Sequence, residues 1–420
     1  MRRGLLAAFL TAATAVLAAV TVPAALADQS QPAVVSANPV DYTPNILDGT
    51  VLSLALVGRT VVVGGDFDQV AAAGSPLSQV RYGIFGYDLY TGALTGFAPQ
   101  IDGPVNALAA GPGDTVYVGG RFSKVNGVAQ RGLAQLDLST GQRVPGFKAS
   151  LDSGDVRTLA YAHGWLYAGG SFSGINGHTR TALARLNPAT GALDSGLDLR
   201  LTAPHTAPTR VYDLSVSPDG SKLVAIGAIE AAGGQPRAQL LMASIGAAGV
   251  SLSGWYTDAY RAACDSAYDT YLRAVDFSPH GDYFVVVSTG KLTGPGMMCD
   301  SAARFEATGT GAHGPTWVNY TGGNSLFAVD VTGAAVYVGG HEQWLDNPYG
   351  DKYAGPGAVY RPGIGAINPV TGKALSWNPT RTRGVGVRAF LACSAGLIVG
   401  SDTDQLGHEY HGRIGMFPPG

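Results

Sequence analysis

The chain has 420 residues and carries little charge: Asp, Glu, Lys and Arg make up 14% of it, and the formal net charge is −3. Without a basic excess there is no field to hold a phosphate backbone, so the composition argues against nucleic acid as a partner. Glycine accounts for 60 residues, about twice its usual share, and charged helix-forming stretches are absent after the first thirty residues. This composition predicts an all-β protein with many turns.

The N-terminus has the order of a secretory signal peptide. Its parts are an arginine pair at 2–3, an apolar run over 4–22, and small residues at Ala25 and Ala27. We therefore expect a signal peptide over 1–27 and a single mature domain over 28–420, secreted and without membrane insertion after cleavage. The alternative is a retained anchor, because the apolar run is just long enough to span a bilayer.

One stretch, 105–141, defines a repeating unit of short strands. Apolar residues alternate with others from Val105, a Gly-Pro-Gly-Asp turn interrupts them, and the pattern resumes at Val116. Gly119-Gly120 ends the second strand where a side chain would meet a neighbouring backbone, and Asn126-Gly127 supplies a hairpin turn. A third strand is predicted over 132–138 and a fourth over 143–149.

This unit recurs through the chain at steps of 51 to 61 residues. The repeats begin at Val51, Val105, Val156, Val211, Leu272, Leu326 and Val387. A period of this size, built of about four short strands, is best satisfied by sheets stacked around an axis. The predicted fold is a seven-bladed β-propeller, with six or eight blades as alternatives.

The two ends of the mature chain together complete one unit. The last repeat has only 34 residues, from Val387 to Gly420, and 23 residues precede the first repeat, from Asp28 to Thr50. We expect the segment 39–46 to supply the missing outer strand of the last blade. Such sharing closes the ring and removes two exposed sheet edges.

The chain has three cysteines, two in polar stretches and one in an apolar stretch. Cys264 and Cys299 lie in polar, loop-like stretches of a chain predicted to be exported, so we expect a disulfide between them. Cys393 lies in an apolar strand and is predicted to be a buried thiol. No Cys or His spacing typical of zinc is present.

Two long polar loops, 341–351 and 401–411, follow the second strand in the last two repeats. Equivalent loops of adjacent blades emerge on the same face, so the loops are predicted to be neighbours. The candidate ligand-binding residues are His341, Glu342, Trp344, Asp346, Asn347, Tyr349, Asp402, Asp404, His408 and Glu409.

These loops allow three interpretations. The carboxylates are calcium ligands, or the loops form a polar groove in which Trp344 and Tyr349 stack on sugar rings. In the third, structural interpretation, the acids cap turns and pair with Arg361, Arg383 and Arg413. No metal site or catalytic residue is assigned, and no cofactor is predicted apart from calcium under the first interpretation.

The repeated Val-Tyr-Val-Gly-Gly-x-Phe, Val-Asn-Gly and Asp-x-x-Thr-Gly sequences resemble the delta-60 type β-propeller repeat of secreted and surface proteins of bacteria. The likeness covers nearly all of the chain after Thr50 and is strongest in the second and third repeats. Stretches such as Trp377-Asn378-Pro379 look like the tail of an exported subgroup, often joined to carbohydrate-binding domains. The resemblance implies a fold and a compartment, and very little chemistry.

The sequence therefore predicts a secreted, non-catalytic propeller that binds an extracellular glycan or a surface protein through loops on one face. One alternative is a polysaccharide lyase or hydrolase that uses Asp346, Asp402, Asp404 and Glu409. The chain lacks the Gly-x-Ser-x-Gly motif of many serine hydrolases. Another alternative is an architectural module of a surface assembly.

Overall fold

The computed structural model describes residues 1, 31–204, 207–265, 268–291, 295–382 and 384–420. The predicted signal peptide falls on residues outside this set, apart from Met1. Every regular element within the described residues is a β-strand. Among them we find no helix of the length and apolarity needed to cross a bilayer.

The larger sheets follow one another along the chain, and each begins with an antiparallel hairpin. They are β2 (Thr50–Val57), β3 (Thr60–Asp66) and β6 (Ile84–Asp88); β7 (Val105–Ala110), β8 (Thr115–Gly120) and β11 (Leu133–Asp137); β12 (Val156–Ala162), β13 (Trp165–Gly170) and β16 (Leu183–Leu186); β17 (Arg210–Val216), β18 (Lys222–Ala228), β21 (Leu240–Gly246) and β22 (Gly249–Leu252); β24 (Leu272–Phe277), β25 (Tyr283–Ser288), β26 (Ser301–Glu306) and β28 (Trp317–Tyr320); β29 (Leu326–Val331), β30 (Val336–Gly340) and β33 (Ile364–Ile367); and β34 (Ala389–Cys393), β35 (Gly396–Gly400) and β38 (Ile414–Phe417).

In most of the repeats, small hairpins follow the second strand of the sheet along the chain. They are β4 (Gln69–Ala71) with β5 (Ser78–Val80); β9 (Lys124–Val125) with β10 (Val128–Ala129); β14 (Gly174–Ile175) with β15 (His178–Thr179); β19 (Ala231–Ala232) with β20 (Gln235–Pro236); β31 (Trp344–Leu345) with β32 (Val359–Tyr360); and β36 (Gln405–Leu406) with β37 (Glu409–Tyr410). The predicted turn at Asn126-Gly127 is confirmed, with φ values of 50° and 75°. The remaining short pair, β23 (Trp255–Tyr256) and β27 (Gly311–Ala312), is parallel.

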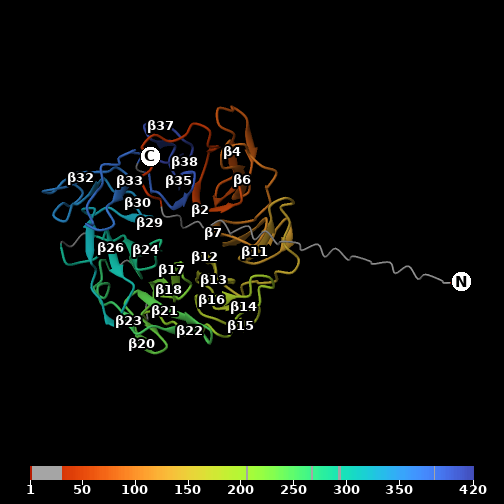
Figure 1. The fold of residues 1–420 in the computed structure, drawn as a ribbon, viewed down its shortest axis with the longest axis horizontal. Helices are drawn as coiled ribbons and strands as arrows, with labels where there is room; N and C mark the ends of the chain where they lie inside the picture. Colours follow the sequence, from red (N-terminus) through yellow and green to blue (C-terminus); the bar gives the residue numbers. More distant parts are fainter. Residues whose placement is uncertain (2–30, 205–206, 266–267, 292–294, 383) are drawn as a thin grey trace.

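The sheets surround a common axis, with the first strand of each nearest the centre (Figure 1). Each first strand contacts the first strand of the next sheet, in the order β2, β7, β12, β17, β24, β29 and β34. Strand β34 also contacts β2, so the last sheet lies against the first.

The predicted fourth strand over 143–149 is wrong in extent. The segment pairs with β11 through a bridge between Leu136 and Arg143, and the N–H of Val144 donates to the Gln135 carbonyl at 2.8 Å. Pro145 follows Val144 and has no N–H to offer a ladder, which limits the pairing.

The hydrophobic core is divided among the interfaces between sheets. In one cluster, Val62 and Ile84 of the first sheet pack with Val105 and Val118 of the second. The cluster that contains Val51 also contains Ile398, so the last and first sheets share a core of the same kind. Burying each such aliphatic side chain contributes about 1.5–3 kcal/mol.

The repeated glycines allow the sheets to approach closely. A Cβ atom at Gly64 would lie 2.6 Å from Cγ1 of Val105 in the next sheet, and one at Gly400 would collide with Val51. Any larger residue at these positions pushes the sheets apart. The prediction that a side chain would meet a neighbouring backbone is confirmed for the second glycine of the pair, since a Cβ atom at Gly120 would collide with the Pro104 carbonyl oxygen. At the first glycine the obstacle is a valine side chain of the next sheet.

Polar side chains on the first strands also connect neighbouring sheets. Asp213 on β17 accepts hydrogen bonds from Thr158 Oγ1 at 2.8 Å and from the backbone N–H of Val275 at 2.9 Å. It therefore ties β17 to both β12 and β24. Asp330 binds the N–H of Ala392 in the same manner, at 2.9 Å.

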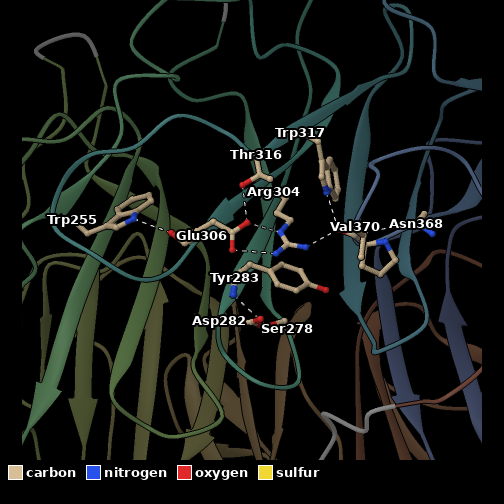
Figure 2. A network of polar contacts seen from close by, with 11 residues as sticks. Trp255, Ser278, Asp282, Tyr283, Arg304, Glu306, Thr316, Trp317, Asn368 and Val370 are labelled. Carbon is tan, nitrogen blue, oxygen red and sulfur yellow. Dashed lines mark hydrogen bonds and ion pairs between the residues drawn. The ribbon is translucent and has the colours of Figure 1, made fainter.

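Figure 2 shows a further connection, from β26 to the sheet that follows it. Arg304 donates to both carboxylate oxygens of Glu306, at 2.8 and 3.1 Å, and to the Pro369 carbonyl at 2.8 Å. Trp317 Nε1 donates to the same carbonyl at 2.9 Å. The guanidinium lies 3.7 Å from the ring centroid of Tyr283, so one arginine holds a turn of the neighbouring sheet.

The N-terminal segment runs beside the last strand. The N–H groups of Ser36 and Val40 donate to the carbonyls of Pro418 and Met416, each at 2.9 Å. The paired stretch thus begins earlier than the predicted 39–46. Strand β1 (Asn45–Ile46) pairs instead with β4 beside the first sheet.

The predicted cysteine chemistry is confirmed. Cys264 and Cys299 form a disulfide with a Cα–Cα separation of 5.7 Å, and Cys393 is a buried free thiol. The bridge links the insertion after β23 to the segment that precedes β26.

Replacing Asp213 by Ala is expected to lower the free energy of unfolding by about 2–4 kcal/mol, because buried donors on three strands lose their acceptor. Asp114→Ala, at an exposed turn, is expected to stay within about 0.5 kcal/mol of the parent chain. Urea unfolding followed by tryptophan fluorescence measures both. Equal stability of the two variants would contradict the role given to Asp213.

Candidate functional site

Several of the predicted ligand-binding residues have structural partners. Asp346 accepts hydrogen bonds from Asn319 Nδ2 at 2.7 Å and from the backbone N–H of Ala374 at 3.1 Å, and Lys373 Nζ lies 3.8 Å from its carboxylate. Its side chain is 12% exposed. Asp346 therefore holds the 341–351 loop against the preceding and following strands.

Asp402 and Asn347 likewise bind backbone groups. The carboxylate of Asp402 accepts from the N–H groups of Val385 and Gly386, at 2.6 and 3.0 Å. The Asn347 amide is buried, donates to the Tyr353 carbonyl at 2.9 Å and accepts from the Gly355 N–H at 2.8 Å. The contacts of Asp402 agree with the interpretation in which the acids cap turns, and Asn347 plays a similar structural part.

Glu342 occupies a position filled by phenylalanine in earlier repeats. Strand pairing places Gly340 level with Gly65 and Gly120, so Glu342 corresponds to Phe67 and Phe122. Its side chain is fully buried. His341 beside it packs edge-on against Phe327, with ring centroids 6.3 Å apart.

The remaining predicted residues reach the surface. Asp404 and His408 are exposed, and His408 contacts the Thr380 hydroxyl at 3.3 Å. Glu409 lies 3.5 Å from His411 Nε2. These side chains are open to solvent in the 401–411 loop and can meet a ligand.

Aromatic side chains gather on the hairpins of the same two loops. Trp344 on β31 packs against Tyr360 on β32 with ring centroids 5.0 Å apart. Four tyrosines in and beside these loops are largely exposed, and we call them the outer tyrosines. They are Tyr349 (65%), Tyr353 (62%), Tyr360 (49%) and Tyr410 (54%).

A buried arginine that the sequence analysis missed joins the two loops. Arg381 Nη1 donates to Thr403 Oγ1 at 2.8 Å, another of its nitrogens binds the Gly340 carbonyl, and Nε donates to the Gly363 carbonyl at 2.9 Å. It takes the bridge position that Ile101 holds in an earlier repeat. The sequence did offer one signal for this site: an arginine stands at a position where an earlier repeat has an isoleucine.

The pairing of the loop acids with arginines is not observed for two of the three arginines. Arg361 donates to the Leu375 carbonyl, with Nε at 3.2 Å, and Arg413 donates to the carbonyls of Ile46 and Gly49 at 2.9 Å. Arg383 lies outside the described residues. Over the described ranges, no group of three or more His, Cys, Asp and Glu side chains is placed to hold a metal ion.

A cavity of about 780 Å³ lies between the first strands of the sheets. Its wall carries four arginines and three aspartates, which are Arg121, Arg157, Arg273, Arg388, Asp66, Asp155 and Asp213. The sequence analysis placed candidate ligands on the outer loops and named none of these residues. The cavity is therefore a second place where a ligand can bind.

One buried carboxyl has an unusual acidity. Asp300, next to the Cys264–Cys299 bridge, is fully buried at the start of the third strand of its sheet. Burial raises the pKa of Asp300 to about 7. The group therefore changes charge near neutral pH.

Comparisons with known proteins support the β-propeller class that the sheets and the central cavity define. A family model described as a domain of unknown function (DUF5122) β-propeller matches residues 164–197. No curated protein matches the chain.

Two solved structures are similar to this one at low sequence identity. The crystal structure of the RRP9 WD40 repeats has a TM-score of 0.55 and 12% identity, over 91% of this chain and 98% of that one. The WD40 β-propeller domain of Doa1 has a TM-score of 0.50 and 11% identity, over 90% of this chain and 96% of that one. At such identities the likeness concerns the fold alone.

Asp346→Ala is expected to cost about 2–3 kcal/mol of folding free energy, because it leaves the N–H of Ala374 and the amide of Asn319 without their acceptor. Asp404→Ala, in the neighbouring loop, is expected to change stability by less than about 0.5 kcal/mol. Thermal and urea unfolding of both variants check this. A stable Asp346→Ala protein would mean that this carboxylate is free for another role.

Asp300→Asn is expected to remove part of the pH dependence of stability. The folded carboxyl keeps its proton up to about pH 7, whereas the unfolded one releases it near the ordinary value of 3.8. The folded state therefore binds more protons between these values, and stability falls as pH rises from 4 to 7. We expect the parent chain to lose on the order of a few kcal/mol through this group.

Urea unfolding at pH 4.5 and pH 8 measures that loss, with Asp114→Asn as the control at an exposed turn. The Asp300→Asn variant should show a smaller difference between the two pH values than the parent and the control. A difference as large as that of the parent would rule out Asp300 as its source.

Proposed function

We propose that the chain is a secreted, seven-bladed β-propeller of the delta-60 repeat type, whose ring is closed by N-terminal residues joining the last blade. Secretion is inferred from the N-terminal sequence. Closure is supported by the bonds of Ser36 and Val40 to the Pro418 and Met416 carbonyls and by the core shared between β34 and β2. The repeat period supports the count of seven blades.

We further propose that the molecule binds an extracellular glycan and performs no chemistry on it. The exposure of the outer tyrosines on two adjacent polar loops carries this proposal. A tyrosine ring offers an apolar face for a sugar ring and a hydroxyl for hydrogen bonding, and it has little conformational freedom to lose. Asp404, His408 and Glu409 lie in the 401–411 loop and supply polar contacts.

The enzymatic alternative has less support. A hydrolase or lyase needs carboxylates directed at a substrate, whereas Asp346 and Asp402 are bound to backbone N–H groups of their own chain. The second candidate is a surface protein as partner. The fold favours it, because β-propellers commonly serve as protein-interaction scaffolds and exposed tyrosines also suit protein interfaces.

A glycan array probed with the purified mature chain tests the proposal. Tyr410→Ala and Tyr360→Ala are expected to weaken binding about tenfold each, as loss of one stacking contact implies. Tyr82→Ala removes a tyrosine that is 43% exposed beside a different sheet and serves as the matched control. Absence of glycan binding by the parent chain, or equal binding by all three variants, would refute the glycan proposal.

A further inference from the structure

The first strands of successive sheets share a β-bulge near their beginnings. The pairing shifts register between Val156 and Thr158, and it does so at the matching place in the other sheets from β2 to β29. A bulge re-aims the extra side chain. Here the extra residue of each strand lines the central cavity, and Arg388 takes the equivalent place just before β34.

The bulge residues form an arc in which arginines and aromatic rings alternate. In sheet order they are Arg157, Tyr212, Arg273, Phe327 and Arg388, while the two preceding sheets contribute Leu52 and Asn106.

Contacts between these side chains hold the arc in place. The guanidinium carbons of Arg157 and Arg273 lie 4.8 and 5.3 Å from the ring centroid of Tyr212. Arg388 lies 4.1 Å from the ring centroid of Phe327. Such cation–π contacts orient the guanidinium planes and leave their N–H edges available to a ligand.

The positive charge of the arc is only partly compensated. Arg157 is 3.4 Å from Asp155, which also binds Ser171. For Arg273 and Arg388, no carboxylate lies within ion-pairing distance among the described residues. Arg273 donates instead to the carbonyls of Thr270 and Leu272, each at 3.0 Å.

Burial is the main cause that lowers the pKa of Arg388 and the pKa of Arg273. Repulsion between neighbouring arginines adds to this lowering, from Arg273 on Arg388 and from Arg157 on Arg273. In the opposite direction, Asp402 and Asp269 raise the pKa of Arg388 and of Arg273, respectively. An anion placed among the three relieves this repulsion.

Two further aspartates line the cavity. Asp213 accepts hydrogen bonds from Thr158 and Val275, and burial raises its pKa to about 6, so its negative charge is weakened at mildly acidic pH. Asp66 is exposed at the end of β3, and Arg121 occupies the corresponding place just after the end of β8.

We propose that the central cavity is a binding site for a small multivalent oxyanion, held by Arg157, Arg273 and Arg388. Guanidinium groups bind carboxylate, phosphate and sulfate oxygens in pairs. The cavity volume of about 780 Å³ falls in the range of roughly 300 to 1,000 Å³ typical of small-molecule sites. This site is separate from the outer tyrosines and goes beyond the glycan proposal.

Isothermal titration calorimetry on the full mature chain tests the site. The probes are citrate, glucose 6-phosphate and N-acetylglucosamine 6-sulfate, each at an ionic strength matched with sodium chloride, so that the arms separate carboxylate, phosphate and sulfate. At least one probe is expected to bind with one-to-one stoichiometry. Arg388→Gln should weaken it about tenfold, and Arg273→Gln/Arg388→Gln together should abolish measurable binding.

Three further variants make the result specific. Arg388→Lys keeps the positive charge but removes the paired N–H donors of the guanidinium, so this variant should bind with intermediate affinity. Arg59→Gln removes the same charge at a site 65% exposed in the β2–β3 hairpin and should bind like the parent chain. Tyr410→Ala should also bind the oxyanion normally, which separates this site from the glycan proposal.

Two results would overturn the site. One is heat no greater than that of chloride for all three probes. The other is parent-like affinity in a folded Arg273→Gln/Arg388→Gln protein, with folding verified by a thermal melt. If the Gln variants do not fold, the Arg388→Lys variant decides: unchanged affinity there rejects the site, and a several-fold loss supports it.

Discussion

Close approach between neighbouring sheets is the constraint on which this structure depends. No sheet has a core of its own, because each hydrophobic cluster takes side chains from two consecutive sheets. Glycines such as Gly64 and Gly400 permit that approach, and valines such as Val105 and Val51 fill the space. First-strand acids add directional bonds across the same interfaces, so that packing and hydrogen bonding enforce one spacing.

The same spacing explains which features of the fold could be predicted from the sequence. A repeated glycine facing a repeated valine is visible in the sequence, as are the hairpin asparagines and the turn at the end of each third strand. The fold class and the disulfide between Cys264 and Cys299 followed from such local signals. The fourth strands were harder, since a segment such as 143–149 pairs through one bridge and differs little from a loop.

The candidate sites were less predictable, for a different physical reason. Composition shows that a loop is acidic, but it does not show which carboxylate will meet a backbone N–H, as Asp346 and Asp402 do. Arg157 and Arg273 point into the cavity because each lies at a register shift, which the simple alternation of a strand does not predict. Arg157, Arg273 and Arg388 come from different repeats, and the arrangement of the sheets around one axis brings them to one cavity.

The bonds of Ser36 and Val40 with the final strand have a consequence for how the molecule is made. Pro418 and Met416 are synthesised almost last, so Ser36 and Val40 stay without these partners until nearly the whole polypeptide has been made. Long-range pairing of this kind is slow to form. An unfinished chain therefore cannot complete the contact between its N-terminal segment and the last sheet.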